Sequence, residues 1–238
     1  ALPTDQYDKY VRSVHGKALL EHGDLSAPAC NDCHGNHGAA PPEVQDIAFV
    51  CGNCHGREGE MFSASKAKLA LTLGSRRGCV TCHSNHDIEL PDDRMMSVGP
   101  DGLCGKCHQH GDAAKEMTTR FHALKDSLHS VDSLLAISDR RGMDVSDARQ
   151  SLQEGRDKLI EARVAVHAFD RKVMGGILDE GRASVSRARE RGTDLLADWR
   201  HRRIGMAASL GVILLLIVVL VLRIRWLDRW AADGQRSR

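Results

Sequence analysis

The sequence has few aromatic residues, no excess of charge and no cysteine outside one repeated pattern. Phe, Trp and Tyr together make up only 4% of the 238 residues, which is little apolar bulk for the core of a chain this long. The formal net charge is +1, so the composition gives no indication of a nucleic-acid partner. Something other than aromatic side chains must therefore fill part of the interior.

All 8 cysteines lie in four copies of the pattern Cys-x-x-Cys-His. The copies begin at Cys30, Cys51, Cys79 and Cys104, continue to Cys33, Cys54, Cys82 and Cys107, and end at His34, His55, His83 and His108. This is the attachment pattern of c-type haem. Two thiols bond the porphyrin, and the histidine binds the iron as the proximal ligand. Zinc sites, redox dithiols and disulfide frameworks do not need a histidine after every second cysteine. We therefore predict four covalently bound haem c groups, which also supply apolar bulk.

One apolar run is long enough to cross a membrane. Residues 204–222 form a stretch of 19 residues without a charge. As a helix this stretch is about 28 Å long, which is close to the hydrocarbon thickness of a bilayer. Arginine and tryptophan residues flank it on both sides, within residues 199–203 and 223–230, as is typical of membrane interfaces. We predict a single transmembrane helix in a lipid bilayer.

The haems set the expected orientation of this helix. Positive charge is similar on its two sides, so the positive-inside rule does not decide. Covalent haem attachment takes place outside the bacterial cytoplasm. We therefore expect the N-terminal part on the periplasmic or outer side of the bacterial inner membrane, and residues 223–238 as a cytoplasmic tail. The chain opens at Ala1, and we interpret it as a mature form that has lost a secretory signal.

The motif region, residues 1–111, contains an internal repeat. Residues about 10–54 and 61–107 align as two dihaem units. In each unit the first motif is followed by Asn-His, which gives His37 in one copy and His86 in the other. Each copy ends in Cys-Gly-x-Cys-His. The sequence therefore predicts two related pairs of haems.

These strings also resemble a known family. Ser13-Val-His-Gly-Lys-Ala-Leu and Cys30-Asn-Asp-Cys-His-Gly-Asn-His are similar to the multihaem cytochromes with doubled Cys-x-x-Cys-His motifs. This is the broad group around tetrahaem cytochrome c3-like and NapC/NirT-like proteins. The resemblance covers about residues 7–110. It implies bis-histidine electron-transfer modules in which closely stacked haems form a conducting cluster.

Four irons need up to four further histidines as distal ligands. His37 and His86 are candidates because they recur three residues after a proximal histidine, and His15 matches the Ser-x-His-Gly element of the family. The second repeat has Lys66 where the first has His15. A histidine from elsewhere must then serve, or one iron is open or bound by methionine; the candidates are Met61, Met95, Met96 and Met117. A closed iron transfers electrons, whereas an open one binds small molecules.

Residues 112–203 have the spacing of packed helices. Apolar residues recur alternately every three and four positions in three stretches, which are residues 117–135, 145–173 and 178–199. This heptad pattern predicts a three-helix antiparallel coiled-coil stalk. We expect helix breaks at Gly142, before Asp144 as an N-cap, and at Gly175-Gly176.

The stalk also offers a distal ligand. If the first helix turns back at Gly142, residue 167 returns opposite residue 117, since both are 25 residues from the turn. We therefore select His167 as the fourth distal ligand, with His122 as the runner-up. The other histidines are interpreted as surface or structural residues: His22, His110, His129 and His201.

Together these features predict a mainly α-helical protein with much irregular structure. Its expected parts are a tetrahaem domain (1–111), a stalk (112–203), a transmembrane helix (204–222) and a tail (223–238). The sequence shows no acid–base pair or nucleophile, so we expect a non-catalytic electron-transfer subunit. It would relay electrons between a membrane redox complex, of cytochrome b or other quinol-oxidising type, and a soluble or outer acceptor.

Two alternatives stay open. One is a direct quinol dehydrogenase of NapC/NirT type, and the other is a reductase of small oxyanions or nitrogen oxides with one open haem near Lys66.

Overall fold

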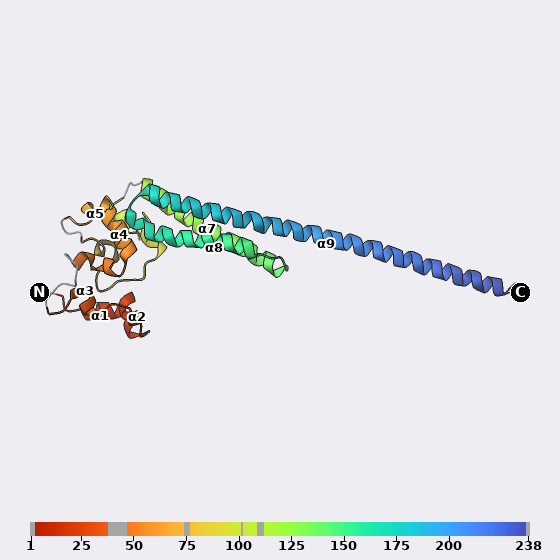
Figure 1. Cartoon of the computed structure of the whole chain (residues 1–238), viewed down its shortest axis with the longest axis horizontal. Helices are drawn as coiled ribbons and strands as arrows, with labels where there is room; N and C mark the ends of the chain where they lie inside the picture. The colour runs from red at the N-terminus through yellow and green to blue at the C-terminus, as the bar shows by residue number, and fades with distance from the viewer. Residues whose placement is uncertain (1–2, 38–46, 74–76, 101, 109–111, 237–238) are drawn as a thin grey trace. The chain divides into compact units, whose positions relative to one another are not determined.

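The described part of the protein is mainly helical. The computed structural model describes residues 3–37, 47–73, 77–100, 102–108 and 112–236. No strand occurs within these ranges. By its internal contacts the chain divides into two compact units: residues 1–128 with 153–184, and residues 129–152 with 185–238. Long helices contribute residues to both units (Figure 1).

Before residue 112 every helix is short. The α-helices are α1 (Gln6–Arg12), α2 (Val14–Leu20), α3 (Cys30–His34), α4 (Gly56–Ala64), α5 (Ala67–Ala70) and α6 (Val80–His83), and the 3-10 helices are η1 (Ile47–Asn53), η2 (Asp93–Met96) and η3 (Cys104–Lys106). Helices of this length are marginal on their own. Phe62 is the only buried apolar side chain described in this part of the chain. The short helices therefore depend on something other than a conventional apolar core.

The backbone conformation at the motifs recurs between the two sequence repeats. The first and third motifs lie on α-helical turns, α3 and α6, whereas the second and fourth lie on the 3-10 helices η1 and η3. Gly35 and Ser84, each directly after the histidine of a motif, have φ of 73° and 65°. His37 and His86 have φ of 54° and 53°. For Ser84 this is a conformation almost confined to glycine, so the turn that presents His86 is held in place by its surroundings.

The rest of the chain forms long helices. These are α7 (Asp112–Arg140), α8 (Ser146–Ala165), the short η4 (Val166–Ala168) and α9 (Arg171–Arg236). Most of their buried apolar side chains lie at predicted heptad positions: Met117, Phe121, Leu124, Leu128, Leu159, Ala162 and Leu178 in the first unit, and Val131, Leu135, Val145, Leu152 and Val185 in the second. Met143, Ala165 and Met174 are buried outside this pattern, and Phe169 and Val173, which belong to it, are exposed. The helical spacing of the sequence thus identified most positions of this core, and the coiled-coil stalk as a whole stays a prediction.

Contacts within the first unit give the directions of the helices. The Arg163 guanidinium lies 5.7 Å from the centre of the Phe121 ring, which is the register that a turn at Gly142 gives to α7 and α8. A Cβ atom on Gly181 of α9 would come 2.8 Å from Leu124 of α7. Lys158 of α8 pairs with Glu180 of α9 at 2.6 Å. Glycine at position 181 therefore permits a close approach between α9 and its neighbours.

The predicted helix break at Gly175-Gly176 is wrong, because both glycines lie inside α9. The break comes earlier, at Phe169, whose φ is +48°. Asp170 then accepts a hydrogen bond from the backbone N–H of Lys172 at 2.7 Å, as an N-cap does. The glycine at 175 instead makes room for Arg120, which donates to the Gly175 carbonyl at 3.1 Å. The second helix accordingly ends at Ala165 and does not run on to residue 173.

Within the described residues one helix is long and apolar enough to cross a membrane, and it is α9. The apolar side chains from Ile204 to Leu227 are all exposed. No break separates the predicted transmembrane stretch from the residues before it, or from the tail as far as Arg236.

Candidate haem-binding site

The structure brings three motif histidines face to face with three of the predicted distal histidines. The rings of His34 and His86 lie 5.7 Å apart between centres, with 14° between their planes. His83 and His167 lie 6.0 Å apart, at 18°, and His15 and His55 lie 6.2 Å apart, at 37°. Each pair joins a proximal candidate to a histidine from another segment.

These separations fit an iron held between two imidazoles. A metal–imidazole bond is about 2 Å long, so two such bonds in line place the ring centres about 6.3 Å apart. The three observed distances lie close to this value. Nε2 of His34 and Nε2 of His86 are 3.4 Å apart, so this pair would need to open slightly. Two histidines per iron are the ligands of bis-histidine haem. When haem is bound, it supplies one-electron redox chemistry.

Burial favours the neutral imidazole that binding to a metal requires. Desolvation lowers the pKa of His15, and the nearby His55 lowers it further. Desolvation likewise lowers the pKa of His83, with smaller contributions from His167 and His55. Because His55 acts on His83, two of the histidine pairs are neighbours. Both rings are thereby kept ready for a metal at neutral pH.

Two distal candidates are tied together through the backbone. His15 lies in the first turn of α2, where the Ser13 hydroxyl accepts a hydrogen bond from the N–H of Gly16 at 3.0 Å. Next to it, the N–H of Val14 donates to the carbonyl of Ile88 at 2.8 Å. Ile88 lies two residues after His86. The start of the first repeat is therefore joined to the segment that carries the distal histidine of the second.

The pair of His83 and His167 depends on the helical part. His167 lies on η4, and its Nδ1 is 2.9 Å from the carbonyl of Val164. A carbonyl can only accept, so Nδ1 carries the proton, and Nε2 is free for a metal. Phe169, which follows η4, contacts Phe62 of α4 with ring centres 6.2 Å apart. The segment after α8 is thus anchored to the helix that follows the second motif.

The cysteines of successive motifs are neighbours in chain order. Burial and then the nearby Cys51 raise the pKa of Cys33. A hydrogen bond from the Cys79 thiol lowers the pKa of Cys51 to about 6 and raises that of Cys79. Burial and then Cys107 raise the pKa of Cys82. A cysteine that is bonded to haem has a thioether sulfur, which does not titrate. In a haem-bound chain these pKa shifts would therefore not apply, and the shifts only show which cysteines lie close together. These contacts bring the first motif next to the second, the second next to the third, and the third next to the fourth.

A cavity adjoins the first histidine pair. It has a volume of about 920 Å³ and is lined by Cys30, Cys33, His34 and His86 together with Tyr10 and Phe49. This volume lies in the range of cofactor pockets. Cys30 and Cys33 therefore meet both axial candidates around one space of suitable size.

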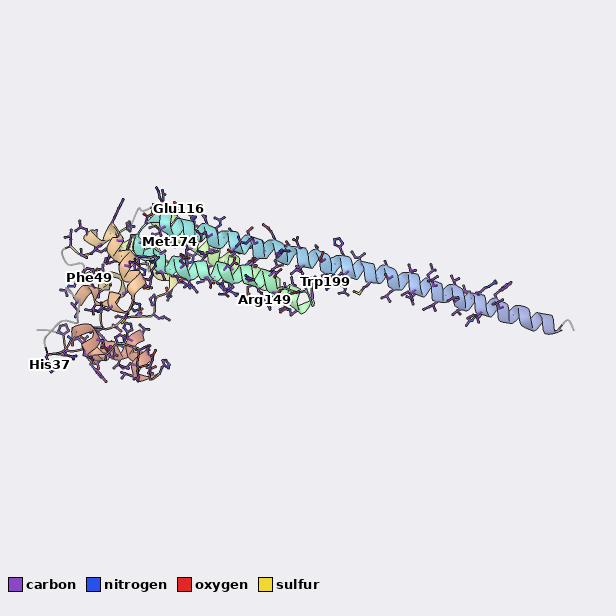
Figure 2. All side chains as sticks on the ribbon, in the orientation of Figure 1. His37, Phe49, Glu116, Arg149, Met174 and Trp199 are labelled. Carbon is purple, nitrogen blue, oxygen red and sulfur yellow. The ribbon has the colours of Figure 1, made fainter. Side chains whose placement is uncertain are left out.

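The fourth motif has no such partner among the described residues. His108 is exposed, and no described histidine ring contacts it. His37, labelled in Figure 2, is also exposed, and Lys66 is an exposed residue at the start of α5. The runner-up His122 packs edge-on against Phe121 at 5.9 Å. His110 lies outside the described residues, and His22, His129 and His201 are exposed. The predictions for His37 and for the fourth iron therefore stay predictions.

The donor arrangement does not resemble a bare metal site. In the part of the chain that the structure describes, no three His, Cys, Asp or Glu side chains converge as ligands of one ion. A structural zinc site needs four such donors at one point. The rival zinc interpretation of the motifs thus finds no geometry among these residues.

One residue of the site was missed by the sequence analysis. The Asp93 side chain on η2 is only 11% exposed. It accepts hydrogen bonds from Lys125 of α7 at 2.6 Å and from Arg163 of α8 at 2.9 Å. Burial alone would raise the pKa of Asp93, but these two cations hold it below its usual range. Nothing in the sequence marks this aspartate, because its partners are 32 and 70 residues away.

Comparisons with known proteins add no assignment. No family model matches the chain, and the searches of curated proteins and of solved structures found no match.

Proposed function

We propose that the protein is a membrane-anchored tetrahaem cytochrome c that relays electrons. It would take them from a quinol-oxidising membrane complex and pass them to a periplasmic or outer acceptor. The observation that carries this proposal is the set of three facing histidine pairs, each of which contains one histidine of a Cys-x-x-Cys-His motif. Paired imidazoles close both axial positions of an iron, which suits electron transfer and not substrate binding.

The neighbouring cysteines support a relay along the chain order of the motifs. Each haem would be covalently fixed through its two cysteines, so contacts between motifs keep successive porphyrins close. The link between Cys51 and Cys79 joins the two dihaem units. Electrons could then enter at one end of the cluster and leave at the other. The protein's part is to fix the ligands, the spacing and the exposure of each haem.

The exposed apolar stretch of α9 supports membrane attachment. The proposed topology has the motif region on the periplasmic or outer face of the bacterial inner membrane and the C-terminal residues in the cytoplasm. It rests on the need to attach haem outside the cytoplasm.

The proposal can be tested on the full chain produced in a bacterium that attaches haem c. We expect a mass increase of four haems and a low-spin spectrum for at least three of them. Electrons should arrive only when a quinol-oxidising partner complex is present. A haem count of zero would refute the proposal. Rapid reduction by a quinol analogue in lipid, with no partner, would instead favour a direct quinol dehydrogenase.

A second function is favoured by the exposed His108. If its iron has no second ligand, that haem can bind small molecules, and the protein would be a reductase of small oxyanions or nitrogen oxides. Carbon monoxide distinguishes the two functions. A reduced spectrum that carbon monoxide leaves unchanged supports the carrier. A change confined to one haem, the same haem whose spectrum His108→Ala alters, supports the reductase.

A further inference from the structure

The turn between α7 and α8 meets α9 close to the start of the apolar stretch. The guanidinium of Arg141, in this turn, lies 4.2 Å from the centre of the Trp199 ring. The guanidinium of Arg203 lies 4.9 Å from the same ring. All three residues belong to the second unit, and Figure 2 labels Trp199 beside the end of the hairpin that also carries Arg149. Trp199 therefore lies between two arginines, one from the α7–α8 turn and one from α9.

The position of Trp199 on α9 sets a depth for this cluster. Trp199 precedes Ile204, the first residue of the apolar stretch, by five positions, which is about 7.5 Å along a helix. The headgroup region on each side of a bilayer is about 5–8 Å thick. With residues 204–222 in the hydrocarbon, Trp199 and the turn that touches it lie at headgroup depth. Tryptophan is enriched at this level.

The cluster carries an excess of positive charge. Five arginines near Trp199 are exposed: Arg140, Arg141, Arg200, Arg202 and Arg203. Among the nearby acids, Asp139 is paired with Arg149 at 2.8 Å, and Asp144 accepts from the backbone N–H of Ser146. Asp194 and Asp198 are exposed on α9. Arg149 thus neutralises Asp139, and the three other acids are outnumbered by the five arginines.

We propose that the α7–α8 turn is a second membrane contact, which binds the headgroups of anionic phospholipids between Arg141 and Arg203. The planar guanidinium fork suits phosphate oxygens, and anionic lipids attract basic residues next to a membrane helix. The proposal rests on the membrane anchoring proposed above. It gives the hairpin a role of its own, because a turn seated in the headgroups would fix the tilt and rotation of α9.

A spin label tests this on the haem-loaded full chain in lipid nanodiscs. The native cysteines are expected to be thioethers, so an Arg140→Cys variant has one free thiol for the label. Ser133→Cys, an exposed position on the same helix, is the matched control. In bilayers with phosphatidylglycerol, we expect the label at 140 to lose its access to a water-soluble relaxation agent, whereas the label at 133 keeps it. Equal access at both positions would overturn the proposal.

Lipid charge and the two arginines are tested separately. Protection at 140 should be lost in pure phosphatidylcholine, and also when Arg141→Gln and Arg203→Gln are combined. The control Arg149→Gln should keep it. Protection that is the same in neutral lipid, or that occurs only with a partner protein, would refute a lipid headgroup site. Failure of the chain to enter the nanodisc at all would instead refute the anchoring, and flotation of the sample detects this outcome.

Discussion

The motif region and the long helices of this protein are built on different physical principles. The long helices have their own apolar core, in which Phe121, Leu124 and Leu152 are each 0% exposed. The motif region has short helices and, in its described part, Phe62 as its only buried apolar side chain. Its short helices instead bring together histidine pairs and neighbouring cysteines, of which His34 and His55 are exposed. The long helices are thus stabilised by their own side chains, and we propose that bound haem stabilises the motif region.

The largest expected effect comes from withholding haem. In a chain with all eight cysteines changed to alanine, we expect residues 3–108 to lose amide protection, because no core remains to replace the porphyrins. Helices α7 and α8 should keep theirs. Hydrogen exchange with mass spectrometry, on the full chain in detergent, would measure both parts at once. If α2 and α4 kept their amide protection without haem, the proposed dependence of the motif region on haem would be wrong.

A smaller effect is expected in the helical core. Leu135 is 1% exposed and Ile137, two positions along α7, is 37% exposed. Leu135→Ala should lower the free energy of unfolding of the helices by about 2–5 kcal/mol, because it leaves a cavity. Ile137→Ala should cost about 1 kcal/mol or less. Denaturant titrations followed by circular dichroism would compare the two variants. If the haem spectrum of Leu135→Ala changes before the helices unfold, the two regions are not independent.

The smallest effect concerns Asp93, which links the regions. Arg163 lies four residues before His167, so the ion pair helps to place that ring opposite His83. We expect Asp93→Asn to shift one haem partly from low-spin to high-spin, with the haem count unchanged. Electron paramagnetic resonance would measure the shift, and His167→Ala should affect the same haem more strongly.

Two further variants separate positioning from general stability. Asp93→Glu should restore most of the low-spin signal, since it keeps the charge. Asp139→Asn, which removes an exposed ion pair with Arg149, should leave every haem unchanged. A fully low-spin spectrum in Asp93→Asn would show that the His83–His167 pair does not depend on this contact.

Local sequence patterns predicted much of the helical fold. Heptad spacing identified the buried positions of α7 and α8, and Gly142 marked their turn. The local pattern misplaced the next helix break, since a pair of glycines usually indicates the end of a helix. Gly175 is kept in α9 by its close contact with Arg120, and this contact between distant residues leaves no local pattern.

For the histidines, too, the sequence predicted the candidates but not their contacts. The repeat singled out His86, the Ser-x-His-Gly element of the resembling family singled out His15, and the fold-back of α7 on α8 singled out His167. Which motif each of them faces could not be predicted. His86 crosses to His34 of the other repeat, whereas His15 stays with His55 of its own. The crossing depends on how the two sequence repeats pack together, and the hydrogen bond between Val14 and Ile88 is one contact between them.

The sequence by itself determined the four motifs, the repeat, the heptads and the apolar stretch of α9. These are encoded within short windows, because covalent attachment, helix periodicity and membrane insertion all act locally. Only the tertiary structure decided the pairing of the histidines, the placement of Asp93 between two helices and the contact of Arg141 with Trp199. Each of these joins residues far apart in the chain, and its energy arises only when separate elements pack together.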